Sequence, residues 1–98
     1  MKFTQTIEFS TTRIDEFSAH LDEWIATSEG RRIPHRAVLR RDRDADNVYQ
    51  LTVEFSSHEI AMENSSRPET AAFASFLGEI SDGGLSFRNF DVLREDDL

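Results

Sequence analysis

The hydrophobic pattern of this sequence switches repeatedly between a period of two and a period of about 3.6 residues, and the order of the switches limits the possible folds. Residues 2–9 alternate between apolar and polar side chains, which predicts a strand. Residues 13–29 carry apolar side chains at helical spacing, and Gly30 suits the left-handed position that follows a helix. The apolar stripe of this predicted helix consists of Ile14, Phe17, Leu21, Trp24 and Ile25.

The rest of the chain repeats this order with an added strand. Residues 34–41 and 48–55 flank the polar turn 42–47, which predicts a hairpin. A short helix over 59–63 is followed by the break "SSRP", a longer helix and a last strand over 85–93. The longer helix has the apolar stripe Phe73, Phe76, Leu77 and Ile80.

Capping residues predict where two of these helices begin. Thr12 and Asp15 resemble a capping box at the start of the first helix. Ser66 and Glu69 form a second capping box, and Pro68 is tolerated there because first-turn N–H groups have no acceptor within the helix.

The order β-α-β-β-α-β predicts an α+β, ferredoxin-like fold, in which a four-stranded antiparallel sheet carries its helices on one face. We expect residues 1–98 to form a single domain. The opposite face of the sheet would be partly apolar, so we expect a second copy of the chain to cover it and form a homodimer through the sheet face. The apolar residues of that face are Val38, Val48, Phe90 and Val92.

Composition excludes several classes of protein and site. A net charge of −8 argues against nucleic acid as a partner, and the lack of cysteine rules out disulfides and thiolate metal ligands. The first residues lack the apolar run of a signal peptide, and no segment approaches the roughly 20 apolar residues of a membrane span. We therefore expect a cytoplasmic protein with no membrane partner.

Arginines cluster in the first half of the chain, although the chain as a whole is acidic. They could bind an anionic ligand, or they could lie on the exposed face and turn of the hairpin and pair with Asp42, Asp44 and Asp46. Charge runs are usually solvated, which favours the second interpretation. The cluster consists of Arg31, Arg32, Arg36, Arg40, Arg41 and Arg43.

The stretch "DRDADNVYQLTVEFSSHEIAMENSSRPETAAF", residues 42–73, resembles the central part of the antibiotic biosynthesis monooxygenase-like proteins. It has an acidic hairpin turn, a strand that carries Glu54, a short helix, a break with proline, and a helix that leads to Phe73. The resemblance implies a dimeric α+β barrel and a cofactor-independent monooxygenase that acts on an aromatic or polyketide-type substrate. The alternative is a non-catalytic dimeric barrel that binds a small ligand or a partner.

Some positions depart from the pattern of that family. Many members carry a histidine directly after the proline of the break, where this chain has Glu69. The positions that supply Asn, Trp and His in the haem-degrading members hold Ile7, Glu63 and Phe73 by hand alignment. We therefore expect no haem, no other cofactor and no metal, and the resemblance leaves open whether the chain is an enzyme.

Three polar side chains are candidate catalytic residues, because an oxygenase without metal or flavin must remove a proton from its substrate. Gln5 interrupts the apolar face of the first strand, although it could simply be a buried amide with satisfied hydrogen bonds. His20 borders the stripe of the first helix, and His35 begins the second strand on the face of Ala37 and Leu39. Either histidine could act as a general base, or could be an ordinary surface residue.

The substrate is expected to be a small apolar or aromatic ligand between the helices and the sheet. A cavity of about 300 Å³ or more in that space, with Gln5 or a histidine facing inward, would favour an enzyme, and a packed core would favour the non-catalytic alternative. The residues expected to line the substrate site are Phe17, Trp24, Glu54, Asn64 and Phe73.

Overall fold

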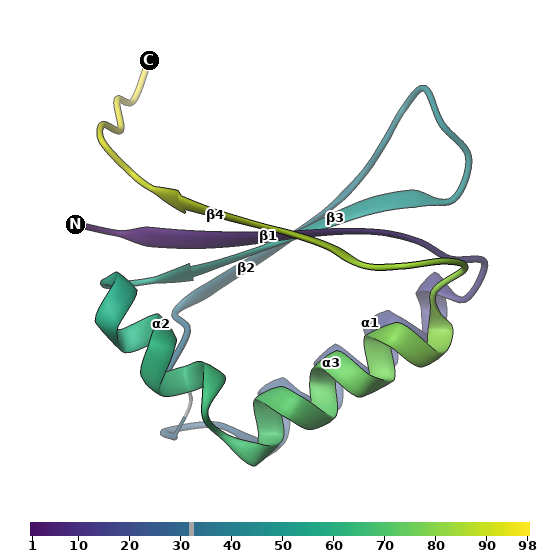
Figure 1. Cartoon of the computed structure of the whole chain (residues 1–98), viewed down its shortest axis with the longest axis horizontal. Coiled ribbons are helices and arrows are strands. Elements are labelled where there is room, and N and C mark those ends of the chain that lie inside the picture. The colour runs from purple at the N-terminus through teal and green to yellow at the C-terminus, as the bar shows by residue number, and fades with distance from the viewer. Residues whose placement is uncertain (32) are drawn as a thin grey trace.

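A computed structural model of the chain describes residues 1–31 and 33–98, so Arg32 of the predicted arginine cluster lies outside the described residues. Among the helices of the described residues, none has the length and apolar character needed to cross a bilayer. The elements follow the predicted order, with boundaries within a few residues of those expected (Figure 1). They are β1 (Phe3–Ser10), α1 (Ile14–Thr27), β2 (Arg36–Arg41), β3 (Val48–Phe55), α2 (His58–Ser65), α3 (Pro68–Ile80) and β4 (Ser86–Asp91).

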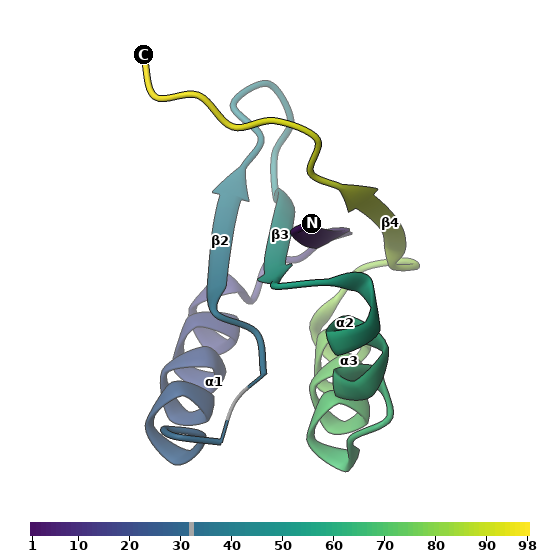
Figure 2. The same cartoon turned by 90° about the vertical axis from the view of Figure 1, so that its left-hand side faces the viewer.

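The strands form one antiparallel sheet in the order β2-β3-β1-β4. Figure 2 shows α1 and the α2–α3 pair on the same side of this sheet. We call that side the helix face and the opposite side the open face. The α+β, ferredoxin-like fold with helices on one face is thereby confirmed.

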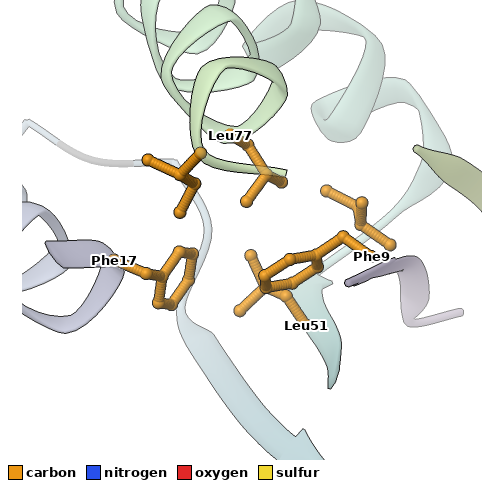
Figure 3. Close-up of a cluster of buried hydrophobic side chains, with 6 residues drawn as sticks. Phe9, Phe17, Leu51 and Leu77 are labelled. Atoms are coloured by element: carbon orange, nitrogen blue, oxygen red, sulfur yellow. The ribbon is translucent and has the colours of Figure 1, made fainter. Parts of the chain in front are cut away.

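The main core lies between the helix face of the sheet and the two longer helices. Figure 3 shows Phe9 of β1, Leu51 of β3, Phe17 of α1 and Leu77 of α3 pointing toward one another, and all four side chains are almost fully buried. Burying a side chain of this size stabilises the fold by about 1.5–3 kcal/mol. A smaller cluster of Phe3, Phe55 and Ala61 packs under α2.

The C-terminal part of the predicted stripe of α1 is not part of this core, which includes Ile14, Phe17 and Leu21. Ile25 is 41% exposed, so its predicted place on the inner stripe is wrong. Figure 1 shows α1 and α3 diverging from the sheet with distance from the β1–α1 connection, which leaves the last turns of α1 farther from it. Periodicity alone does not report this tilt, because it describes only the angle around the helix axis.

The predicted capping residues are wrong by one position or more. The helix α1 has Arg13 as its N-cap residue, so Thr12 lies one residue too early to cap the helix, and Thr11 is the side chain that accepts from Arg13 N–H at 2.9 Å. Ser66 has helical backbone angles and ends α2, where its hydroxyl donates to the carbonyl of Glu63 at 2.8 Å. An N-cap residue has non-helical backbone angles, and Arg67 adopts extended ones before Pro68 begins α3.

Candidate functional site

A pocket of about 560 Å³ opens on the helix face, at the outer part of the β2–β3 hairpin. Figure 1 shows the hairpin extending beyond the rest of the sheet at the end where α1 begins. Strand register places Leu39 opposite Leu51 and Arg41 opposite Tyr49, so the side chains of β2 that line the pocket alternate onto the same face as the core. The residues that line the pocket are Ile14, Leu39, Arg41, Arg43 and Tyr49.

Backbone contacts hold the hairpin turn against the start of α1. Thr11 N–H, in the connection before α1, donates to the carbonyl of Asn47 at 2.9 Å, and Asp42 N–H closes the turn itself by donating to the carbonyl of Val48 at 2.9 Å. Asn47 has a φ of 62°, in the left-handed region that asparagine tolerates better than most residues. These contacts bring Ile14 and the arginines of the hairpin to the same pocket.

The pocket combines an apolar wall with positive charge. Within residues 1–31 and 33–98, no ion pair joins Arg41 or Arg43 to a carboxylate, so the predicted pairing of these arginines with the aspartates of the turn is not found. Asp42 instead accepts from the backbone N–H of Asp44 at 2.8 Å. Because a guanidinium group is charged at all physiological pH values, the pocket can attract an anion.

The predicted residues His20, Phe17 and Phe73 lie together, but at the contact between α1 and α3. The ring of His20 stacks on Phe76 with a centroid separation of 3.9 Å, and its centroid lies 5.7 Å from that of Phe73. The rings of Phe17 and Phe73 meet edge to face at 5.9 Å. This part of the space between the helices is therefore occupied by packed aromatic rings.

Gln5 lies on the helix face of β1, between the buried side chains of Phe3 and Ile7, as predicted. Its side-chain amide donates to Oδ1 of Asn89, on the neighbouring strand, at 3.2 Å. The polar group is therefore satisfied by a cross-strand side chain, and Gln5 is only half-buried.

His35 is joined to Glu54 rather than to the helix face. Nε2 of His35 lies 2.7 Å from Oε1 of Glu54, and the ammonium of Lys2 lies 3.1 Å from the same oxygen. Glu54 alternates with the buried Leu51 and Phe55, so it belongs to the open face. The predicted face of His35 is wrong because this residue precedes the first residue of β2 and does not follow the strand alternation.

The environment of Glu54 favours its charged form. Hydrogen bonding to His35 and then to Lys2 lowers the pKa of the Glu54 carboxyl below its ordinary value. Lys2 also pairs with Glu95 at 3.1 Å, which attaches the C-terminal segment to β1. These contacts form an ion-pair cluster, defined here as Lys2, His35, Glu54 and Glu95.

The remaining predicted residues lie elsewhere. Trp24 is half-buried on α1, and Asn64 lies near the end of α2, where its carbonyl accepts from the hydroxyl of Thr70 at 2.7 Å. None of the predicted site residues is among those that line the pocket of about 560 Å³. The sequence feature that points to this pocket is the arginine cluster, which includes both Arg41 and Arg43.

Metal binding has no support in the part of the chain that the structure describes. No group of three or more His, Asp or Glu side chains is placed there so that it could hold an ion. The chemistry available to the pocket is that of an apolar wall, a phenol and two guanidinium groups.

Comparison with known proteins defines the class of fold. No family model matches the chain, and no curated protein matches it. Solved structures do match, beginning with the cofactor-independent oxygenase SnoaB from Streptomyces nogalater, at a TM-score of 0.75 and 20% identity over 96% of this chain and 95% of that one. Rv0793 from Mycobacterium tuberculosis follows at 0.74 and 15% identity, over 99% of this chain and 100% of that one.

A third structure bears the name of the group itself. It is an antibiotic biosynthesis monooxygenase that matches with a TM-score of 0.70 and 9% identity, over 96% of this chain and all of the other. The chain therefore has the fold of the antibiotic biosynthesis monooxygenases, and the resemblance inferred from residues 42–73 is confirmed at the level of fold.

Proposed function

We propose that this chain is a small cofactor-independent monooxygenase that acts on an aromatic or polyketide-type substrate. The observation that carries the proposal is the fold shared with a cofactor-independent oxygenase over 96% of the chain. The pocket of about 560 Å³ has a volume within the roughly 300–1,000 Å³ of ligand sites, but it lies at the edge of the hairpin and not in the packed space between α1, α3 and the sheet where the sequence predicts a substrate cavity.

The lining of the pocket suits a planar substrate. Ile14 and Leu39 provide an apolar surface, and the ring of Tyr49 provides an aromatic one. A phenol with an adjacent ring methylene can lose a proton and pass electrons to O₂ directly. The methylene becomes a carbonyl that keeps one oxygen atom, and the second oxygen atom leaves as water, so no external reductant is required.

Of the two predicted bases, His20 lies on the helix side of the sheet, at the contact between α1 and α3, and it does not line the pocket, so its role as base requires the substrate to extend between these helices. It is half-buried among the aromatic rings of Phe73 and Phe76. His35 is joined to Glu54 on the open face, so we do not place it in the reaction. Gln5 lies on the helix face, but it does not line the pocket and its amide is bonded to Asn89, so we do not place it in the reaction either.

We also propose that residues 1–98 act as one domain and as a cytoplasmic homodimer. The support for the dimer is the open face of the sheet, over which no described helix lies (Figure 2). Phe90 is 44% exposed on that face, beside the guanidinium of Arg88 at 5.7 Å. Pairing of two open faces would remove this apolar surface from water.

Oxygen uptake tests the proposed reaction. We would incubate the purified protein with a tricyclic phenol that carries a ring methylene, in the presence of a metal chelator, and follow O₂ consumption and formation of the quinone. We expect uptake of one O₂ per quinone formed, and a loss of more than about tenfold for Leu39→Glu, which places a charge in the apolar wall.

Two further results would revise the proposal. Loss of activity in His20→Gln but not in Leu39→Glu would place the substrate between α1 and α3 instead of in the pocket. Binding of the phenol with no oxygen uptake above the protein-free rate would favour the non-catalytic alternative.

A further inference from the structure

We infer that the pocket beside Tyr49 selects aromatic ligands that carry a negative charge, with Arg41 and Arg43 binding the anionic group. As a statement about substrate, this rests on the proposed function, whereas the binding preference can be measured without any reaction. The ligand class is a planar aromatic carboxylate or phenolate whose rings lie against Ile14, Leu39 and Tyr49.

The first support is the arrangement of charge and apolar surface within one pocket. Arg41 belongs to β2 on the helix face, and Arg43 belongs to the turn that follows, so both guanidinium groups reach the pocket from the hairpin. Apolar side chains make up the rest of the wall together with the phenol of Tyr49. An arginine binds a carboxylate with two parallel hydrogen bonds, which gives it geometric as well as electrostatic preference for such groups.

The second support is that the two carboxylates that share a pocket with Arg41 have other donors. Arg41 also lines a smaller pocket of about 220 Å³ together with Glu8 and Asp42. Glu8 accepts from the side-chain amide of Gln50 at 3.2 Å, and Asp42 accepts from Asp44 N–H at 2.8 Å. Neither carboxylate forms an ion pair with Arg41 within the described residues, so the guanidinium is available to a ligand.

Because the chain as a whole is acidic, a preference for anions would indicate binding by the arginines of the pocket. A net charge of −8 repels anions at long range, but charges farther than about 8 Å away are largely screened at physiological salt. Affinity for an anion must therefore come from the few residues that touch it. A preference for anions in such an acidic protein would be difficult to explain by non-specific attraction.

Two fluorescent probes test the inference directly. Anilinonaphthalene sulfonate and phenylnaphthylamine share both ring systems, and they differ by the negatively charged sulfonate. We expect the wild-type protein to bind the sulfonate roughly tenfold more tightly than the neutral probe, as charge-assisted hydrogen bonds to an anion require. The double substitution Arg41→Gln with Arg43→Gln should bring this ratio to about one, because the affinity for the sulfonate falls much more than the affinity for the neutral probe.

Matched variants locate the site. Arg36→Gln removes an exposed arginine from the same strand and should keep the preference, because Arg36 lies opposite Glu54 on the open face. Leu39→Glu should weaken both probes. Arg41→Lys with Arg43→Lys keeps both charges and should keep most of the preference, and it serves as the second test if the glutamine variant unfolds.

Several outcomes would overturn the inference. They are equal affinity of the wild type for both probes, an unchanged preference in the double glutamine variant, or an equal loss of preference in Arg36→Gln. If the preference is present but no phenol supports oxygen uptake, the anion site stands and only the proposed reaction fails.

Discussion

At the scale of single residues, Thr11 connects parts of the molecule that are distant in sequence. Its side chain is fully buried, and its hydroxyl donates to the carbonyl of Ile80 at 2.6 Å, 69 residues away, while accepting from Arg13 N–H. Its backbone N–H donates to Asn47 in the hairpin turn. The pattern of the sequence points to Thr12 as the capping residue, because the contact with Ile80 depends on how α3 ends and is invisible in local sequence.

Replacing Thr11 with valine should therefore destabilise the protein. Valine keeps the shape of the side chain but leaves the buried groups of Ile80 and Arg13 without their partner, which costs about 1–3 kcal/mol of unfolding free energy. Urea denaturation measures the change. The control is Thr12→Val at the neighbouring exposed position, expected within about 0.5 kcal/mol of the wild type. Equal effects of the two substitutions would show that the hydrogen bonds of Thr11 contribute nothing.

At the scale of elements, the break between α2 and α3 shows which features of a helix boundary the local sequence predicts and which it does not. Ser66 and Pro68 correctly predict that one helix ends and another begins between them. The role of Ser66 was predicted wrongly, because the same hydroxyl can cap the start of one helix or bond a carbonyl at the end of the previous one. The backbone conformation decides between the two, and it depends on how the two helices pack.

The ion-pair cluster connects the ends of several elements, and its contribution should depend on pH. Because the contacts with His35 and Lys2 lower the pKa of Glu54, the folded state favours the ionised carboxylate. The stabilisation is therefore present above the ordinary glutamate pKa of about 4.3 and is lost as the pH falls through the lowered pKa of the folded state.

Glu54→Gln tests this dependence. At pH 7 we expect the variant to be less stable than the wild type by up to about 1 kcal/mol, since both partners of Glu54 are partly exposed. The difference should shrink below a pH of about 4.3 as the wild-type carboxylate takes up a proton. Urea unfolding at a series of pH values measures it, with Glu23→Gln on the exposed surface of α1 as a control. A difference that stays constant at all pH values would mean that the charge of Glu54 is not the cause.

At the scale of the whole molecule, the two faces of the sheet have different surroundings. The register of β4 places Phe87 opposite Ile7 on the helix face, and Phe90 opposite Thr4 on the open face. Both phenylalanines are substantially exposed, at 49% and 44% respectively. Substitutions at these two positions can test the proposed dimer against a matched control, because the two residues share a strand and a residue type but lie on opposite faces.

Phe90→Asp should weaken the homodimer and Phe87→Asp should not. A charge buried at an apolar interface without a partner is costly, and we expect at least about a tenfold increase in the dimer dissociation constant for Phe90→Asp. Sedimentation equilibrium of the two variants and the wild type measures this. A monomeric wild type at micromolar concentration, or equal effects of the two substitutions, would remove the open face as the interface.

The sequence by itself determined the order and type of the elements, and the face on which Gln5 lies. These follow from side-chain periodicity, which is a property of neighbouring residues and of backbone geometry. Only the tertiary structure decided that His20 lies between α1 and α3, that His35 turns to Glu54, and that Arg41 and Arg43 share a pocket with Ile14. The physical reason is that a site joins residues from different elements, and their meeting depends on the tilt of the helices, the length of the hairpin and long-range hydrogen bonds such as that of Thr11.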